Sequence, residues 1–556
     1  MAETVTGALL SLVAEASGAG VPRDLPALLD LLTADGVLDK DDPDTDSGDF
    51  RLTPTIRQAM LEELCRLPGG VHEVRSVLIR VGLAHPRRSL AGQLAIWAHQ
   101  NADWASLSDV WLAYPSAIWA TIPHTVVPVF AHVPAKARQA YPVLTQAAAM
   151  TAALDPARAG TYIEQAVGWL RQDGRLLHSG WASLRNPDSA LRAGSIWMMA
   201  QRTMPGHPDP LEDAWETRKA LSALITRQTL AGSPPTSAAQ TLFHANSAAT
   251  ALLRGDIFQA RSDCEQAMML SQPGDLWGLL AAGLEALALT IAGNPRGCER
   301  AAEWFEAAAP ACGPFAEMAN PYRQLALALK AIRELDRETA TKCLRQAAAM
   351  EEGSEFWSAY AWIRSMHDLT WREPDYALAR LESVTSGNLS AEYETLSESL
   401  AVRARADLLC CAGRLHEARA FLKASSHSRL SRYHLASEAR MHLWGLDGAE
   451  ALRVAERGVH DVTIHAPARA HLYAVRSAAL LLTGADAAAV TIALRSACTL
   501  CTEMSDVLPF VLLPSNLRDA LLERHDRLMH ESPCILDRTL IRERLGRVRP
   551  IGCRSR

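Results

Sequence analysis

The chain has 556 residues, of which 49 % are hydrophobic and 21 % are charged, and its formal net charge is −6. Such a chain can form several domains or one long solenoid, and it can bury a large core, which excludes a disordered protein. A mildly acidic protein has no broad electrostatic attraction for nucleic acid or for an anionic membrane surface.

The N-terminal residues predict the only strands of the chain. The segment "DLPALLDLLTADGVL" predicts a helix followed by a strand at Val37–Leu38, and six aspartates follow between residues 39 and 49. The strand "FRL" comes next, and a helix then begins with Thr53 as N-cap and Pro54 in its first turn. This order predicts a winged-helix-like unit over residues 1–66. Its acidic turn would repel phosphates, so we expect no DNA binding by this unit.

The remaining chain predicts helices throughout. The proline-containing segments "MPGHPDP" and "AGSPPTS" interrupt it and mark a boundary region. We expect helical hairpins over 67–203, the boundary region over 204–240, repeats over 241–530 and a basic tail over 531–556. The tail carries seven arginines and two acidic residues from Asp537 onward, and we interpret it as a solvated terminus.

A repeat pattern runs through the second part of the chain. Small or apolar residues recur where the two helices of a tetratricopeptide hairpin approach closely. The pattern returns at about 39 residues, longer than the roughly 34 of the standard repeat. We therefore predict an all-α fold, a tetratricopeptide-like α-solenoid of helical hairpins. The marked positions are Gly255, Ala260, Cys264 and Ala267; Leu335, Ala340, Leu344 and Ala347; Leu154, Ala159, Ile163 and Ala166; and Gly413 and Ala418.

No motif for catalysis, a metal or a nucleotide is recognisable. None of the six lysines follows a glycine, so the sequence has no P-loop, and it has no G-x-G-x-x-G. The single C-x-x-C, Cys498 and Cys501, lacks the second pair that a structural zinc site requires. We predict no enzyme activity, no metal and no cofactor in this chain. The irregularly spaced cysteines indicate reduced thiols, as in a cytoplasmic protein.

The most apolar segment, "LWGLLAAGLEALALTIAG", has the length of a membrane span but is interrupted by Glu285. Asp275 and Arg296 flank it closely. A buried helix of the repeat array is the better interpretation, and we expect no membrane association.

One segment has residue types that suit a ligand surface. In "EFWSAYAWIRSMHDLTW" aromatic, arginine and histidine side chains share one helical face, and together they can hold a sugar, an aromatic compound or a peptide. Packing against the next hairpin explains the same pattern, so both interpretations remain open. The residues are Trp357, Tyr360, Arg364, His367 and Trp371.

Several segments resemble the large ATP-binding LuxR-type transcriptional regulators, the maltose-activator-like group. "FRLTPTIRQAMLEEL" resembles the end of their winged-helix segment, and Ala102-Asp103-Trp104 matches a turn in their first helical pairs. The repeats resemble their tetratricopeptide-like sensor region, and "LPFVLLPSNLRDALLER" resembles the way that region is closed in actinobacterial members.

The resemblance implies a sensor and protein-interaction region that binds a small-molecule effector or a partner protein and controls self-association. Those regulators also contain an ATPase domain with a P-loop and a C-terminal helix-turn-helix. This sequence has neither the P-loop nor the "L-T-x-R-E" of that helix-turn-helix. ATP binding is therefore implied only for a missing ATPase domain, and DNA binding only for a missing C-terminal domain. A free-standing tetratricopeptide-like adaptor that binds a protein partner is the alternative.

Overall fold

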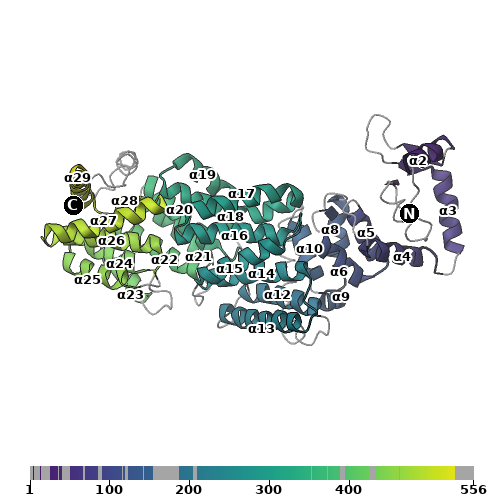
Figure 1. Ribbon diagram of the computed structural model, residues 1–556, viewed down its shortest axis with the longest axis horizontal. Helices are drawn as coiled ribbons and strands as arrows, with labels where there is room; N and C mark the ends of the chain where they lie inside the picture. The colour runs from purple at the N-terminus through teal and green to yellow at the C-terminus, as the bar shows by residue number, and fades with distance from the viewer. Residues whose placement is uncertain are drawn as a thin grey trace.

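The computed structural model is elongated, with a small unit of strands and helices at the N-terminal end and packed helices along the rest (Figure 1). The all-α helical-repeat fold that the sequence predicts is confirmed. The basic tail beyond Glu531 and the expected repeat at Leu154–Ala166 lie outside the described residues. Described are residues 4–5, 13 and 25–531, apart from 36, 41–49, 67–68, 85–89, 115–116, 119–122, 142, 154–186, 204–209, 352–353, 372–373, 389–394, 426–433 and 462–463.

The N-terminal unit contains a small antiparallel sheet in the order β1-β3-β2. The second strand begins at Leu38, opposite Leu52, and runs two residues further than the predicted strand. The helix that follows the sheet begins at Pro54, as predicted from Thr53 and Pro54. The elements are β1 (Thr4–Val5), α2 (Leu25–Ala34), β2 (Leu38–Lys40), β3 (Phe50–Leu52) and α3 (Pro54–Arg66).

A group of helices of varied length connects this unit to the repeats. Their core continues into the repeat array, because Trp111 packs edge-on against Phe130 and also against Phe315, which belongs to η3 (Gly313–Phe315). The helices are α4 (Gly70–Ala84), α5 (Ala91–Gln100), α6 (Trp104–Ala113), α8 (Pro123–Ala131), α9 (Ala135–Ala140), α10 (Val143–Ala153), α12 (Pro187–Thr203) and α13 (Pro210–Leu230). Helix α13 occupies most of the expected boundary region and packs against α12.

Seven successive helix pairs follow in the described part of the chain. Their first helices start at 237, 276, 316, 357, 396 and 435, at intervals of 39 to 41 residues, and the last starts at 466. Each first helix packs against the first helix of the next pair, so one core runs along the array. The pairs are α14 (Ser237–Leu253) and α15 (Ile257–Leu270); α16 (Leu276–Ala292) and α17 (Pro295–Cys312); α18 (Ala316–Arg333) and α19 (Arg337–Gln346); α20 (Trp357–Trp371) and α21 (Pro374–Asn388); α22 (Leu396–Cys411) and α23 (Leu415–Ala424); α24 (Leu435–Trp444) and α25 (Gly448–Val459); and α26 (Ala466–Leu482) and α27 (Ala487–Met504).

The six of these turns that the structure describes share one geometry. After α14, the amide of Gly255 donates to Leu252 O at 3.0 Å and the amide of Asp256 donates to Ala251 O at 2.9 Å, which is the Schellman pattern. Gly255 has φ 82°, and the Asp256 side chain then caps α15 by accepting from Gln259 N at 3.0 Å. The turn at Ala102-Asp103-Trp104 has the same geometry, with φ 52° at Ala102. The residues with positive φ at the corresponding position of each turn are Gly255, Gly293, Leu335, Gly413, Leu446 and Gly484.

Replacement of Leu446 by glycine is expected to stabilise the protein by about 0.5–1 kcal/mol, because the left-handed conformation is costly for leucine and free for glycine. Leu446 is 66 % exposed, so little apolar contact is lost. Leu335 is the matched control, since it has the same conformation but is buried, and Leu335→Gly should lower the melting temperature. Equal effects of the two substitutions in thermal unfolding would contradict this explanation.

The predicted repeat-packing residues differ in what the structure requires of them. The alanines are fully buried between helices, whereas Gly255 and Gly413 both have positive φ. A Cβ added at Gly413 would meet nothing within 4 Å. Backbone conformation, and not close approach of two helices, therefore explains that glycine. The alanines are Ala260, Ala267, Ala340, Ala347 and Ala418.

The last helix pair, α26 and α27, packs against the second pair, α16 and α17. A Cβ added at Gly293, in the turn between α16 and α17, would lie 2.5 Å from Met504 Sδ and 2.9 Å from Pro467 Cγ. The residues after α27 are then buried among earlier helices: Val507 N donates to Arg333 O at 3.1 Å, and Trp444 Nε1 donates to Leu512 O at 3.3 Å. We call residues 505–513 the closing segment. It contains α28 (Leu508–Val511) and precedes α29 (Ser515–Glu531).

The apolar helix α16 buries the carboxyl group of Glu285. Its Oε1 lies 3.3 Å from Arg261 Nε, while its Oε2 has no hydrogen-bond partner in the described part of the protein. Burial raises the pKa of this carboxyl group from 4.5 to about 7. The folded state then binds a proton that the unfolded state releases, so the free energy of unfolding falls as the pH rises from about 4.5 through 7.

Glu285→Gln is therefore expected to raise the melting temperature at pH 8 and to lose most of this advantage at pH 5. Thermal unfolding of both proteins across this range measures the effect. Glu299→Gln, on the exposed side of an ion pair with Lys330, is the control and should show no such pH dependence. A gain in melting temperature from Glu285→Gln that does not change with pH would contradict a raised pKa at Glu285.

Candidate functional site

The residues of the predicted ligand stripe are brought together on α20 but lie inside the array. Trp357, Tyr360 and His367 are buried. His367 Nε2 lies 3.0 Å from Thr341 Oγ1 of α19, and Nδ1 lies 2.9 Å from Asp368 Oδ1. The polar atoms of this histidine are thus used within the protein.

The stripe leaves little room for a ligand. Its last two members contact each other, with the His367 and Trp371 rings 4.8 Å apart, and Arg364 Nε lies 3.4 Å from Asp368 Oδ2. The hollow beside Tyr360 and Arg364, against α21, measures about 10 Å³, which is close to the minimum for one water molecule. The ligand role of the stripe stays a prediction, and it requires these side chains to move.

A second set of polar side chains runs along the buried face of α22. Ser399, Arg403 and Asp407 are four residues apart, so they share one side of the helix, and all three are buried. Arg440 of α24 donates to both oxygens of Asp407, at 2.6 and 2.7 Å. Arg440 Nη1 also lies 2.9 Å from His471 Nδ1 of α26. These contacts connect three successive first helices.

The charges of a second buried ion pair, formed by a residue of α18 and one of the closing segment, act on Arg403 of this set. Arg333, at the end of α18, places Nε 3.2 Å from Asp506 Oδ2, and both side chains are buried. We call the connected side chains the arginine network. Its three guanidinium groups face two carboxylates, so one positive charge is in excess within it. The members are Arg333, Arg403, Asp407, Arg440, His471 and Asp506.

Arg403 carries the least compensated charge of this network. Its Nε lies 3.9 Å from Asp407 Oδ2, which is an ion-pair distance but too long for a hydrogen bond, and the structure gives Nε no other partner in its described part. Burial and the neighbouring Arg440 lower the pKa of the Arg403 guanidinium to about 10. Burial and Arg403 also hold the pKa of His471 well below its usual value, so His471 is neutral.

A groove of about 610 Å³ opens beside this network, between α23, α24 and α25. Apolar side chains line part of it, and exposed charged side chains of α23 and α25 stand at its edge. Three edge residues are cationic and two are acidic, and Arg457 Nη2 donates to Glu438 Oε2 at 3.0 Å. The volume is in the range of small-molecule sites. The lining consists of Arg419, Leu422, Lys423, His434, Leu435, Glu438, Met441, His442, Arg457 and Asp461.

His434 connects the groove to the polar face of α22. It precedes α24, is 5 % exposed, and places Nε2 3.0 Å from Ser399 Oγ. Its Nδ1 has no hydrogen-bond partner among the described residues. Burial, and to a lesser extent the charge of Arg403, lower the pKa of His434 to about 4, so the ring is neutral near pH 7. A neutral ring with one unused nitrogen can accept or donate one further hydrogen bond.

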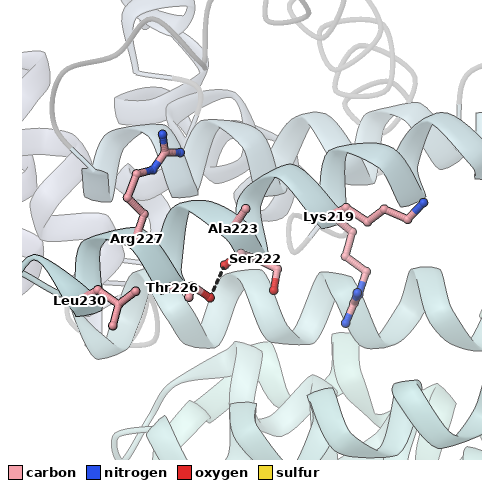
Figure 2. A pocket seen from close by; sticks show the side chains of 7 residues that line it. Lys219, Ser222, Ala223, Thr226, Arg227 and Leu230 are labelled. Carbon is pink, nitrogen blue, oxygen red and sulfur yellow. Dashed lines mark hydrogen bonds between the residues drawn. The ribbon is translucent and has the colours of Figure 1, made fainter.

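A hollow on α13 has a similar size but a different character. All seven of its lining residues come from one face of this single helix, and Figure 2 shows their side chains standing along it. Thr226 Oγ1 donates to Ser222 O at 3.1 Å, and Leu230 is 84 % exposed. Only one wall is formed by described residues, so the groove at α24 is the better candidate site.

Neither the groove nor the arginine network was predicted from the sequence. One signal was present: Ser399, Arg403 and Asp407 recur at four-residue intervals on one face of α22. His434, with Glu438 and His442, recurs in the same way on the facing helix. Polar rows on two neighbouring first helices indicate a buried polar contact, but the sequence does not reveal which faces meet.

Comparison with known proteins assigns no family: no family model matches the chain, and no curated protein matches it. Within the described residues, no three His, Cys, Asp or Glu side chains gather as a metal ion would require. Of the helices that the structure describes, none is long and apolar enough to cross a membrane. The C-x-x-C cysteines, Cys498 and Cys501, are buried and unpaired on α27, and burial raises the pKa of both thiols.

Proposed function

We propose that this chain is the signal-receiving region of a LuxR-type transcriptional regulator. In this proposal a small-molecule effector or a partner protein binds the tetratricopeptide-like repeats and controls assembly of the regulator. The segments that resemble such regulators support it, as does a helical-repeat fold with a groove of suitable size. ATP and DNA are bound by segments that carry the P-loop and the helix-turn-helix, and not by residues of this chain.

The observation that carries the proposal is the position of the groove next to the arginine network. A ligand at His434 would contact a side chain that bonds Ser399, which lies one helical turn before Arg403. From Arg403 the network continues to α24, α26 and the closing segment. A ligand that prefers one arrangement of these helices shifts the population towards it. Binding at the groove can therefore change how the last three helix pairs pack against one another.

The cytoplasmic location belongs to this proposal. The eight cysteines whose side chains the structure describes are buried and form no disulfide with one another, as expected in a reducing compartment. We propose no enzymatic activity for this chain.

The DNA that flanks the reading frame provides the test. A severed or separately encoded regulator requires G-x-x-x-x-G-K-[ST] upstream and "L-T-x-R-E" with a helix-turn-helix downstream. Purification of the chain from its own cells gives the second measurement. If neither motif is found and one protein co-purifies in a fixed ratio, the regulator proposal fails and the chain is a tetratricopeptide-like adaptor.

A further inference from the structure

We infer that the groove between α23, α24 and α25 binds a small organic anion, whose charge complements the excess positive charge of the arginine network behind it. This inference rests on the proposed function, because it names the chemical class of effector that the signal-receiving region would take. Four features of the groove carry it: an unused buried nitrogen, a poorly compensated buried cation, an edge with one more cationic than acidic residue, and a partly apolar lining.

The unused nitrogen is Nδ1 of His434. The side chain is only 5 % exposed, and it lines the groove. Its other nitrogen is held by Ser399 Oγ at 3.0 Å, which fixes the ring. A buried polar atom without a partner destabilises the folded protein, so a ligand oxygen that bonds Nδ1 gains a hydrogen bond that the protein alone does not make.

The poorly compensated cation is Arg403. Arg403 lies one helical turn after Ser399 on the same face of α22. Asp407 is its nearest carboxylate, but Nε and Nη2 of Arg440 both donate to Asp407. His434 contacts Ser399, one helical turn before Arg403, and the pKa of its ring is lowered chiefly by burial and to a lesser extent by the charge of Arg403. An anion at His434 therefore lies in the field of Arg403, and in a partly buried site this attraction is stronger than in water.

The edge and the lining of the groove indicate which further chemical groups the ligand would carry. Arg419 and Lys423 stand on successive turns of α23 and face into the groove, where a carboxylate or phosphate group would be attracted. Leu422 and Met441 supply apolar surface. Apolar surface next to cations favours an organic anion over an inorganic ion, and the groove volume of about 610 Å³ accommodates one small molecule.

Benzoate, benzamide and inorganic phosphate are suitable probes, measured by titration calorimetry at low ionic strength on the full chain. Benzoate and benzamide have nearly the same shape but differ in charge, so their comparison isolates the anion. We expect benzoate to bind, benzamide to bind at least about tenfold more weakly, and phosphate to bind more weakly than benzoate. Equal binding of benzoate and benzamide, stronger binding of phosphate, or no binding of benzoate would overturn the inference.

Two sets of variants locate the site. Arg419→Gln/Lys423→Gln changes exposed side chains at the groove, and Lys342→Gln/Arg345→Gln makes the same exchanges on the exposed face of α19 as a matched control. The groove variant should bind benzoate about tenfold more weakly, and the control should bind it like the wild type. His434→Gln should also weaken benzoate binding. Unchanged affinity in both groove variants, or an equal loss in the control, would place the anion elsewhere.

This result is independent of the test of the proposed function. If benzoate does not bind but the flanking DNA encodes the P-loop and the helix-turn-helix, the effector class is wrong and the regulator proposal stands. If benzoate binds at the groove but the flanking DNA lacks both motifs, the anion site belongs to an adaptor.

Discussion

Asp407→Asn is expected to lower the free energy of unfolding by about 3–5 kcal/mol, the usual consequence of removing one partner from a buried ion pair. Asp407 is the carboxylate that Arg440 binds through two oxygens, and it is the nearest carboxylate to Arg403. Asparagine keeps the shape of the side chain but leaves these two buried guanidinium groups without a negative charge. Asp506, which is paired with Arg333, is then the one carboxylate left among the members of the arginine network.

Urea unfolding followed by tryptophan fluorescence measures this loss. The control is Glu450→Gln, which removes an exposed carboxylate paired with Arg453 and should leave the free energy of unfolding nearly unchanged. The double variant Asp407→Leu/Arg440→Met should recover part of the stability, since apolar replacement of a buried pair removes both desolvated charges. If Asp407→Asn is no more harmful than Glu450→Gln, the network does not hold the helices together.

Arg202→Met is expected to destabilise the protein by about 3 kcal/mol, because this side chain joins segments that are far apart in the sequence. Its guanidinium group lies 2.7 and 3.1 Å from the carboxylate oxygens of Glu355, just before α20. It also donates to Asn246 O at 3.1 Å and to Thr250 Oγ1 at 2.9 Å on α14. The Arg202 side chain is 2 % exposed, so water does not replace these bonds in the folded state.

Amide hydrogen exchange should show where this stability is lost. We expect faster exchange in α12 and α14 of the Arg202→Met protein, and unchanged exchange in α26 and α27, which do not contact Arg202 through any of these bonds. Lys219→Met on α13 is the control, because its ion pair with Glu216 is exposed. Uniformly faster exchange along the whole array would show that Arg202 supports global rather than local stability.

The sequence was a good guide where a feature depends on neighbouring residues. The start of α3 at Pro54 follows from a cap and a proline, and the interval of about 39 residues follows from small side chains that recur in each hairpin. The breaks near 204–210 and 231–237 coincide with the ends of α12 and α13 and the starts of α13 and α14. In each case the physical cause is a backbone requirement or a side-chain volume within one hairpin.

The sequence was a poor guide to the candidate site. Residue types and helical period left two interpretations open for α20, a ligand surface and packing against the next hairpin, and the structure places Trp357, Tyr360 and His367 inside the core. Helical period identifies residues that share a face, but it does not say whether water or another helix covers that face. For the same reason His434 and Arg403 gave no signal of a groove, because their surroundings come from α23, α24 and α25 together.

The amino-acid sequence by itself determined a helical array, its repeat interval and the turns inside its pairs, because short-range hydrogen bonds and close helix packing fix these features locally. Only the tertiary structure decided that the last pair packs against the second, that the closing segment is buried beside Arg333, and that three arginines share two carboxylates. Those contacts join residues from different hairpins, and the small curvature added at each pair determines which of them meet.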